Sequence, residues 1–493
     1  MTKTYMQWLS VFFIVSICGC AAKQVQLVSP EVGPSYMMEA PELLKAKAFH
    51  APKPIVFTAK NGLTVLLLKK DTLPLVKMRF VFRGGKINDG SKSGLAQLSL
   101  DLLDEGYGTT SVTTMSEQLA NIGSGVSSES YTETLNVDLY ATKAHIDRTF
   151  EIASKVITQP RLAQEDFERI KIDQINYIQR KRKDPVALAA QIMWQEAMGP
   201  SHPYGPNSNG SPDSVAKITK QDVQTFLQTY VQPTNAALIV AGDITEKKVQ
   251  ELVEKYLSTW KNTNQSTDEV ALSTPVRAQK QGTRLFLVNK ADAQQSVIYA
   301  SHLGLSGFSE DTDILAITNV ALGGSFTSRL NQNLRENKGY TYSIWSRHMG
   351  YRIPTLFYTS TSVKTDATAA SVQEIFHEFQ AIQQKGITSE EVLKSKALLT
   401  KSFISRFEDL SGLLNEYEFV WSNQLPYDYY DGVQTRQQQA TLASAQQVAK
   451  KVIDWRDMDI VIVGDVAKIK SQLAQLDPKV VDLKKAIYPN LPQ

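Results

Sequence analysis

Short apolar runs separated by turn residues follow one another from residue 54, a pattern typical of β-strands. In PIVFTAKNGLTVLLLKK, Asn61-Gly62 separates two such runs, which predicts a hairpin with a type I′ turn. The segment SGLAQLSLDLLDEG has apolar residues at 95, 98, 102 and 103, and this spacing predicts an amphipathic helix. A longer helix is predicted over 163–182. Strands and helices in this mixture predict an α+β fold.

The same order of elements returns about 222 residues later, which indicates a duplication. The strand NAALIVAGDI, with Gly242-Asp243, matches MDIVIVGDVA, with Gly464-Asp465. The helix from 163 likewise matches TSEEVLKSKALLTKSF from 388. We therefore expect two homologous halves, each a mixed and partly antiparallel sheet with packed helices. The predicted boundaries are 51–262 for the N-terminal domain, 263–275 for a polar linker and 276–493 for the C-terminal domain.

The N-terminus has the features of a bacterial lipoprotein signal. Lys3 precedes an apolar run from Leu9 to Ile17 that is too short to span a bilayer. The sequence Ile17-Cys18-Gly19-Cys20 resembles a lipobox, so Cys20 is the predicted lipidation site and 1–20 the signal peptide. An ordinary secretory signal is the alternative. Residues 21–50 predict a tether, and no Asp follows Cys20, so we expect anchoring at the periplasmic side of the outer membrane.

Composition limits the chemistry of the remaining chain. The 493 residues are 42% hydrophobic and 21% charged, as in ordinary globular proteins. With 53 basic and 50 acidic residues the net charge is +3, too small to favour nucleic-acid binding, and RKRK at 180–183 is interpreted as a solvated helix end. Both cysteines lie in the predicted signal, so residues 21–493 can form no disulfide or thiol site.

Several segments together resemble the pitrilysin/insulinase-type inverted zinc peptidases, a family that includes the mitochondrial processing peptidase subunits. The resemblance covers about 54–490 and implies two peptidase-like halves that form half of a clamshell. The matching segments are GG at 84–85, GLAQLSLDLLDEGYGTTS at 94–111, HPYG at 202–205, VQPTNAALIVAGDI at 231–244 and GGSFTSRLNQNLRENKGYTYSIWS at 323–346.

Active members of this family carry H-x-x-E-H on the helix that begins with the GLA-like segment, and a further Glu downstream. Helical spacing places both imidazoles on one face, with the Glu beside the zinc-bound water. The resemblance puts Gln97 and Asp101 at the two His positions, Leu100 at the Glu position and Gln174 at the downstream Glu. All four groups differ from the family pattern, so we expect no metal in this chain and zinc only in a partner subunit.

The histidines offer no substitute motif. The closest pair, His348 and His377, is 29 positions apart, so no helix carries two histidines within one turn. A zinc site assembled from distant histidines stays open as an alternative, and His202 is more simply explained as a structural residue of the HPYG loop. The six are His50, His145, His202, His302, His348 and His377.

The segment LRENKGYTYS carries the remaining family motif. C-terminal halves of the family have an Arg and, after six residues, a Tyr, which reach the active site and hydrogen-bond the substrate near the scissile carbonyl. Arg335 and Tyr342 match that spacing, whereas Tyr340 is two residues short. Arg donates from a fixed fork, and a Tyr hydroxyl can stabilise an oxyanion. Without the resemblance, an ion pair and a packed strand residue would explain both.

Together these features predict a non-catalytic subunit of a periplasmic peptidase complex. It would lend Arg335 and Tyr342 to an H-x-x-E-H paralogue in a heterodimer that acts on peptides. A non-cleaving, peptide-binding or scaffolding lipoprotein that forms a homodimer is the main alternative. An independently active zinc metallopeptidase is a third.

Overall fold

The hairpin predicted around Asn61-Gly62 is present in the computed structural model as the antiparallel strands β1 (Ile55–Thr58) and β2 (Thr64–Lys69). Its turn is not type I′, because Gly62 has a positive φ of 94° but Asn61 does not. Instead the Gly62 N–H donates to the Ala59 carbonyl over 2.9 Å, so one tight turn is followed by one left-handed glycine.

The structure describes most of the chain from residue 49 onward. Cys20, the predicted signal, nearly all of the predicted tether and about half of the predicted linker lie outside the described residues. Phe49, near the end of the predicted tether, packs on Phe403 and Phe407 with ring centroids 5.9 and 5.5 Å away. The described residues are 49–200, 202–205, 209–263, 270, 272–280, 282–474 and 485–487.

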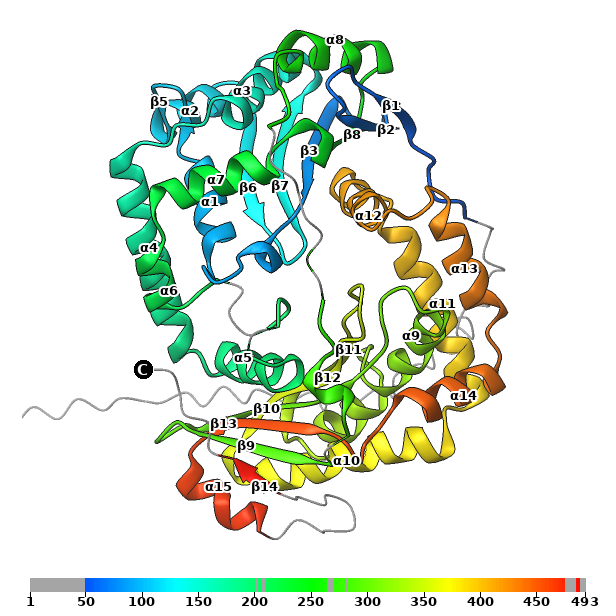
Figure 1. Cartoon of the computed structure of the whole chain (residues 1–493). Helices are drawn as coiled ribbons and strands as arrows, with labels where there is room; N and C mark the ends of the chain where they lie inside the picture. Colours follow the sequence, from blue (N-terminus) through cyan, green and yellow to red (C-terminus); the bar gives the residue numbers. More distant parts are fainter. Residues whose placement is uncertain are drawn as a thin grey trace, which may run out of the picture. The chain divides into compact units, whose positions relative to one another are not determined.

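The N-terminal half contains a six-stranded sheet with the order β1-β2-β8-β3-β7-β6 (Figure 1). β2 and β8 pair in parallel, and the other neighbours are antiparallel. A separate ribbon, β4 (Gly106–Tyr107) and β5 (Thr110–Ser111), follows the first helix. The other strands of the large sheet are β3 (Leu75–Arg83), β6 (Gly125–Ser130), β7 (Thr134–Thr142) and β8 (Ala236–Gly242).

The C-terminal sheet has the order β11-β12-β10-β13-β9-β14 and repeats this pattern. β9 and β13 are parallel where β2 and β8 are parallel, and β10, β12 and β11 follow in antiparallel pairs as β3, β7 and β6 do. Two equivalent halves confirm the predicted fold class. The strands are β9 (Arg284–Asn289), β10 (Gln295–Leu303), β11 (Thr341–His348), β12 (Leu356–Lys364), β13 (Asp459–Gly464) and β14 (Lys485–Ile487).

Helices surround both sheets, and the helices predicted over 93–106 and 163–182 are confirmed within three residues at each end, by α1 (Leu95–Leu103) and α4 (Gln164–Lys183). The N-terminal half also contains α2 (Val112–Ala120), α3 (Ile146–Thr158), α5 (Pro185–Met198), α6 (Pro212–Lys217), α7 (Lys220–Tyr230) and α8 (Glu246–Leu257). The C-terminal half contains α9 (Glu310–Leu322), α10 (Thr368–Lys385), α11 (Ser389–Ser405), α12 (Leu410–Ser422), α13 (Tyr429–Gln439), α14 (Leu442–Val452) and α15 (Val466–Leu473).

Each half covers one face of its sheet with its own helices and the other face with helices from the opposite half. α12 lies against β3 and β8, and α5 lies against β10 and β13 (Figure 1). The first contact joins Leu66 and Ile239 to Leu413 in one core, and the second joins Met193 to Val461 in another. The central strands β8 and β13 are consequently buried along their whole length.

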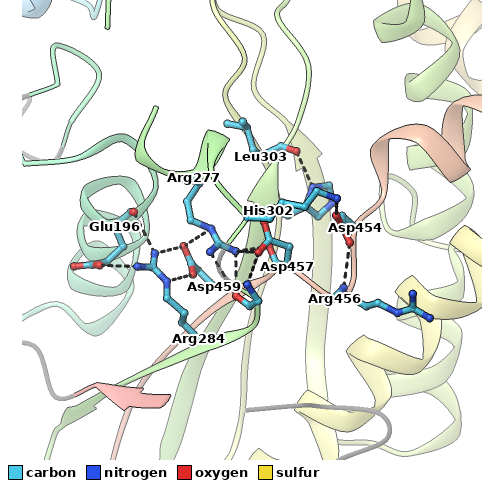
Figure 2. A network of polar contacts seen from close by, with 11 residues as sticks. Glu196, Arg277, Arg284, His302, Leu303, Asp454, Arg456, Asp457 and Asp459 are labelled. Carbon is cyan, nitrogen blue, oxygen red and sulfur yellow. Dashed lines mark hydrogen bonds and ion pairs between the residues drawn. The ribbon is translucent and has the colours of Figure 1, made fainter. Parts of the chain in front are cut away.

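A buried polar network fixes the start of the C-terminal half (Figure 2). Asp459 accepts from Arg284 Nε at 2.8 Å and forms an ion pair with Arg277 Nε at 3.4 Å. Arg277 also pairs with Asp457, at 3.0 Å, and Arg284 donates to the Glu196 carbonyl on α5. Because Arg277 comes directly after the predicted linker, the network connects that segment to β13, β9 and α5.

Candidate functional site

The residues at the family's metal-ligand positions lie on one face of α1 and bind each other. Gln97 Nε2 donates to Asp101 Oδ1 over 2.7 Å, and Ser130 Oγ donates to Gln97 Oε1 over 3.0 Å. Leu100 is fully buried in the hydrophobic core of the N-terminal half. The i and i+4 spacing therefore brings the pair together as predicted, but the amide and the carboxylate satisfy one another.

Asp101 is the one ionisable group among those helix positions. Burial raises the pKa of its carboxyl and nearby Glu129 adds to the rise, whereas the Gln97 bond and the Lys86 charge lower it. Among the described residues no three His, Cys, Asp or Glu side chains gather as metal ligands. A structural or catalytic zinc ion needs at least three protein ligands. The residues present, an amide and a single carboxylate, do not fit zinc.

Gln174 lies on α4 and contacts the start of α1 rather than the Gln97–Asp101 pair. Its Nε2 donates to the carbonyls of Gly94 and Asn209, over 3.0 and 2.8 Å. Gly94 has a φ of 98°, and a Cβ there would lie 2.9 Å from Gln174 Nε2. The predicted long-range proximity of Gln174 to this helix is therefore present, and its role there is to hold the segment before the first helical turn.

Arg335 and Tyr342 lie in the C-terminal half, at the edge of its sheet. Arg335 belongs to a π-helical segment, Asn331–Asn337, and Tyr342 belongs to the edge strand β11. π-Helical turns are frequent at functional sites. The Arg335 guanidinium carbon lies 5.4 Å from the Tyr342 ring centroid and 4.1 Å from that of Phe326. Tyr342 is 86% exposed, whereas the Arg335 side chain is 24% exposed and forms an ion pair with Glu336 at 3.4 Å.

The histidines are engaged in local structure. His202 Nδ1 accepts from the Tyr204 N–H at 3.0 Å, so its Nε2 donates to the Ser273 carbonyl at 2.9 Å. His302 is buried and stacks on Phe357, with ring centroids 5.3 Å apart. The arrangement of His202 agrees with the structural role predicted for the HPYG loop.

Sequence reasoning missed a cavity of about 410 Å³ beside α4 and α5. Lys181 and Arg182 line it, so half of the RKRK run borders a cavity instead of serving only as a solvated helix end. Trp194 and Tyr351 line it as well. The basic run was the available signal, but the aromatic side chains come from segments far apart in the sequence.

The comparisons with known proteins agree with this geometry. The family description "Peptidase M16 inactive domain" matches residues 217–399. The "Non-peptidase homolog YmxG" of Helicobacter pylori (strain ATCC 700392 / 26695) is 22% identical over 82% of this chain and 93% of its own length. The "Zinc protease PqqE" of the same organism is 24% identical over 75% of this chain and 84% of its own length.

Solved structures give the same fold. A peptidase M16 inactive domain from Pseudomonas fluorescens superposes with a TM-score of 0.76 and 19% identity, over 83% of this chain and 97% of that one. A protease from Helicobacter pylori gives a TM-score of 0.75 and 20% identity, over 84% and 99%. Fold and site thus define a protein with the architecture of an inverted zinc peptidase and without its metal ligands. The chain is similar to peptidases of the pitrilysin/insulinase type, and both the matched family description and one of its relatives are of inactive or non-peptidase proteins.

The membrane association predicted from the N-terminus concerns residues outside the described ranges. Among the residues that the structure does describe, none of the helices is long and apolar enough to cross a bilayer.

Proposed function

We propose that this chain is the non-catalytic subunit of a peptidase complex and supplies Arg335 and Tyr342 to the zinc site of an H-x-x-E-H partner. The observation that carries the proposal is the contact between Arg335, on the π-helical segment, and the exposed Tyr342, on the edge strand β11, in a chain whose α1 has an amide–carboxylate pair at the family's metal-ligand positions. That Helicobacter pylori has both a "Non-peptidase homolog" and a "Zinc protease" similar to this chain supports such a pairing.

The chemistry assigned to the pair is binding and transition-state stabilisation. Stacking between Phe326 and Tyr342 restricts the Arg335 guanidinium, so less side-chain entropy is lost when it binds a substrate carbonyl. The Tyr342 hydroxyl can donate to the oxyanion that develops at that carbonyl. Both side chains act on peptide groups and leave water activation to the partner.

The test is peptidase activity of a complex reconstituted from this chain and an H-x-x-E-H paralogue of the same genome. Tyr342→Phe keeps the ring and removes the donor, so we expect kcat to fall about 100-fold with little change in KM. Arg335→Ala should lower kcat/KM by at least a similar factor. Zinc bound to the partner should stay stoichiometric in both complexes.

Tyr340→Phe and Arg347→Ala are the matched controls, since Tyr340 precedes the same strand and Arg347 is an exposed cation on it. Both should retain wild-type kinetics. Full activity of the Tyr342→Phe and Arg335→Ala complexes would refute the assigned role. A chain that sediments as a homodimer and never binds the paralogue would favour the non-cleaving, peptide-binding lipoprotein.

We also propose that Cys20 is acylated and holds the protein at the periplasmic side of the outer membrane. The lipobox-like sequence Ile17-Cys18-Gly19-Cys20 supports this. Cys20→Ala removes the residue that would carry the acyl chains. It should therefore abolish incorporation of an alkyne-labelled fatty acid and release the protein into the soluble fraction. Cys18→Ala is the control and should keep the label. Labelling that survives Cys20→Ala would contradict the assignment.

A further inference from the structure

The cavity beside α4 and α5 has walls from both halves of the chain. Lys181 and Arg182 come from the end of α4, Trp194 from α5, and Lys86 from the segment after β3. Tyr351, from the segment between β11 and β12, closes the C-terminal side. Its volume of about 410 Å³ lies in the usual range for small ligands or a few residues of peptide.

The charges that line this cavity are of one sign. Lys86, Lys181 and Arg182 contribute positive charge, and none of the described lining residues is Asp or Glu. The whole chain is nearly balanced, with 53 basic and 50 acidic residues, so this is a local excess. Asp89, Glu129 and Asp101 act on Lys86 without lining the cavity.

The acidic side chain Glu133 binds the lining residue Tyr204 and also binds Arg352, which does not line the cavity. Glu133 Oε1 accepts from Tyr204 Oη at 2.6 Å and from Arg352 Nε at 2.7 Å. Burial lowers the pKa of Lys86, whose Nζ donates to Asn209 Oδ1 at 2.8 Å. An anion in the cavity would offset the hydration that this ammonium group has lost.

Aromatic side chains that contact one another also line the cavity. The rings of Tyr204 and Tyr351 stack with centroids 4.9 Å apart, and Trp194 meets Tyr351 edge-on at 6.2 Å. Aromatic faces bind apolar side chains and peptide planes with little loss of entropy. The cavity thus combines basic side chains with aromatic rings in its lining.

We propose that this cavity binds a peptide carboxylate, with Lys181 and Arg182 on the anion and the aromatic rings on the neighbouring residue. The choice of peptides over other carboxylates rests on the proposed function, but the site would act in this chain alone. The carboxylate could be a peptide C-terminus or an Asp or Glu side chain, since both present the same group to the basic residues.

The test is calorimetric titration of the full chain, without a partner, with three peptides. These are acetyl-Ala-Phe-Ala-Phe-Ala with a free C-terminus, the same peptide amidated, and an amidated version with Glu in place of the last Ala. We expect the free acid to bind at least about tenfold more tightly than the amide, as charge-assisted hydrogen bonds imply. If the Glu peptide binds as tightly as the free acid, the site accepts any peptide carboxylate. If the Glu peptide binds only as weakly as the amidated Ala peptide, the site is specific for a C-terminal carboxylate.

The basic run provides its own control. Lys181→Gln/Arg182→Gln should reduce the preference for the acid to below about threefold, whereas Arg180→Gln/Lys183→Gln removes the same charge from residues that do not line the cavity and should leave it unchanged. Equal binding of all three peptides, no binding of any, or equal loss in both double variants would overturn the proposal. None of these outcomes bears on the kinetics of the Tyr342→Phe complex, so the two proposals fail independently.

Discussion

On α1 the polar side chains at the family's metal-ligand positions are paired with each other, and the family's Glu position between them is apolar. Gln97 uses both ends of its amide, one toward Asp101 and one toward Ser130, and Leu100 belongs to the core. A buried polar group costs little once it is hydrogen-bonded, so this face stabilises the fold without holding a metal. At Asp104, the next acidic residue, the effect of burial on the carboxylate exceeds that of its hydrogen bonds.

Asp104 makes the stability of the protein depend on pH. Burial raises its pKa from 3.8 to about 7, although Ser128 Oγ and the Ser128 N–H both hydrogen-bond to it. The native state therefore binds a proton more tightly than the unfolded chain does. Its contribution to stability is complete below pH 3.8 and is lost as pH rises through about 7. Asp104→Asn mimics the protonated form, and should flatten the free energy of unfolding between pH 4 and 7.

Urea unfolding at pH 5 and pH 7.5 measures this effect. Between pH 5 and pH 7.5 the free energy of unfolding of the wild-type chain should fall by roughly 2 kcal/mol more than that of Asp104→Asn, because one unit of pKa shift corresponds to about 1.4 kcal/mol. Asp213→Asn, which changes an exposed carboxylate in the first turn of α6, should behave like wild type. An unchanged pH slope in Asp104→Asn would show that the carboxyl is ionised throughout this range.

At the level of elements, local patterns predicted the hairpin, α1, α4 and the repeated strands, because periodicity reports which side of an element is apolar. They could not predict which sheet α5 or α12 would cover, because the apolar face of a helix does not specify the surface against which it packs. The same limit applies to the site. The family resemblance identified Gln97 and Asp101 and helical spacing predicted their shared face, but the cavity joins Lys86, Lys181 and Tyr351 through tertiary contacts alone.

The strands β9 and β13 depend on the buried carboxylate of Asp459. Asp459→Asn leaves Arg277 and Arg284 with one charged acceptor fewer at a buried site, and should lower the free energy of unfolding by about 3 kcal/mol. Asp454→Asn is the control, since its partner Lys280 is exposed, and should cost no more than about 1 kcal/mol. Similar midpoints for both variants in a urea titration would contradict this role.

At the level of the whole molecule, the exchange of α5 and α12 makes each half complete the core of the other. A sheet with one face uncovered would expose a large apolar surface, so neither half is expected to keep its sheet once the other unfolds. The polar contacts across this boundary strengthen the coupling. Glu418 on α12 accepts from Arg79, Thr134 and Asn136, all of which belong to the N-terminal half.

Glu418→Ala should therefore destabilise both halves at once. It leaves Arg79, which is 8% exposed, with Asp138 as its one remaining charged partner, and removes an acceptor from two further side chains, so we expect a loss of about 3 kcal/mol. Hydrogen exchange across a urea series measures it. Amides of β8 in one half and β13 in the other should lose protection together, at a lower urea concentration than in the wild-type chain.

Glu416→Ala separates this coupling from a general weakening of α12. Glu416 lies on the same helix but pairs with Arg406, within the C-terminal half, at 3.3 Å. Its loss should shift both midpoints only slightly, because the contact is partly exposed and does not cross the boundary. If β8 instead opened before β13 in the Glu418→Ala chain, the halves would be separate cooperative units, and the exchanged helices would act as docking contacts rather than as shared core.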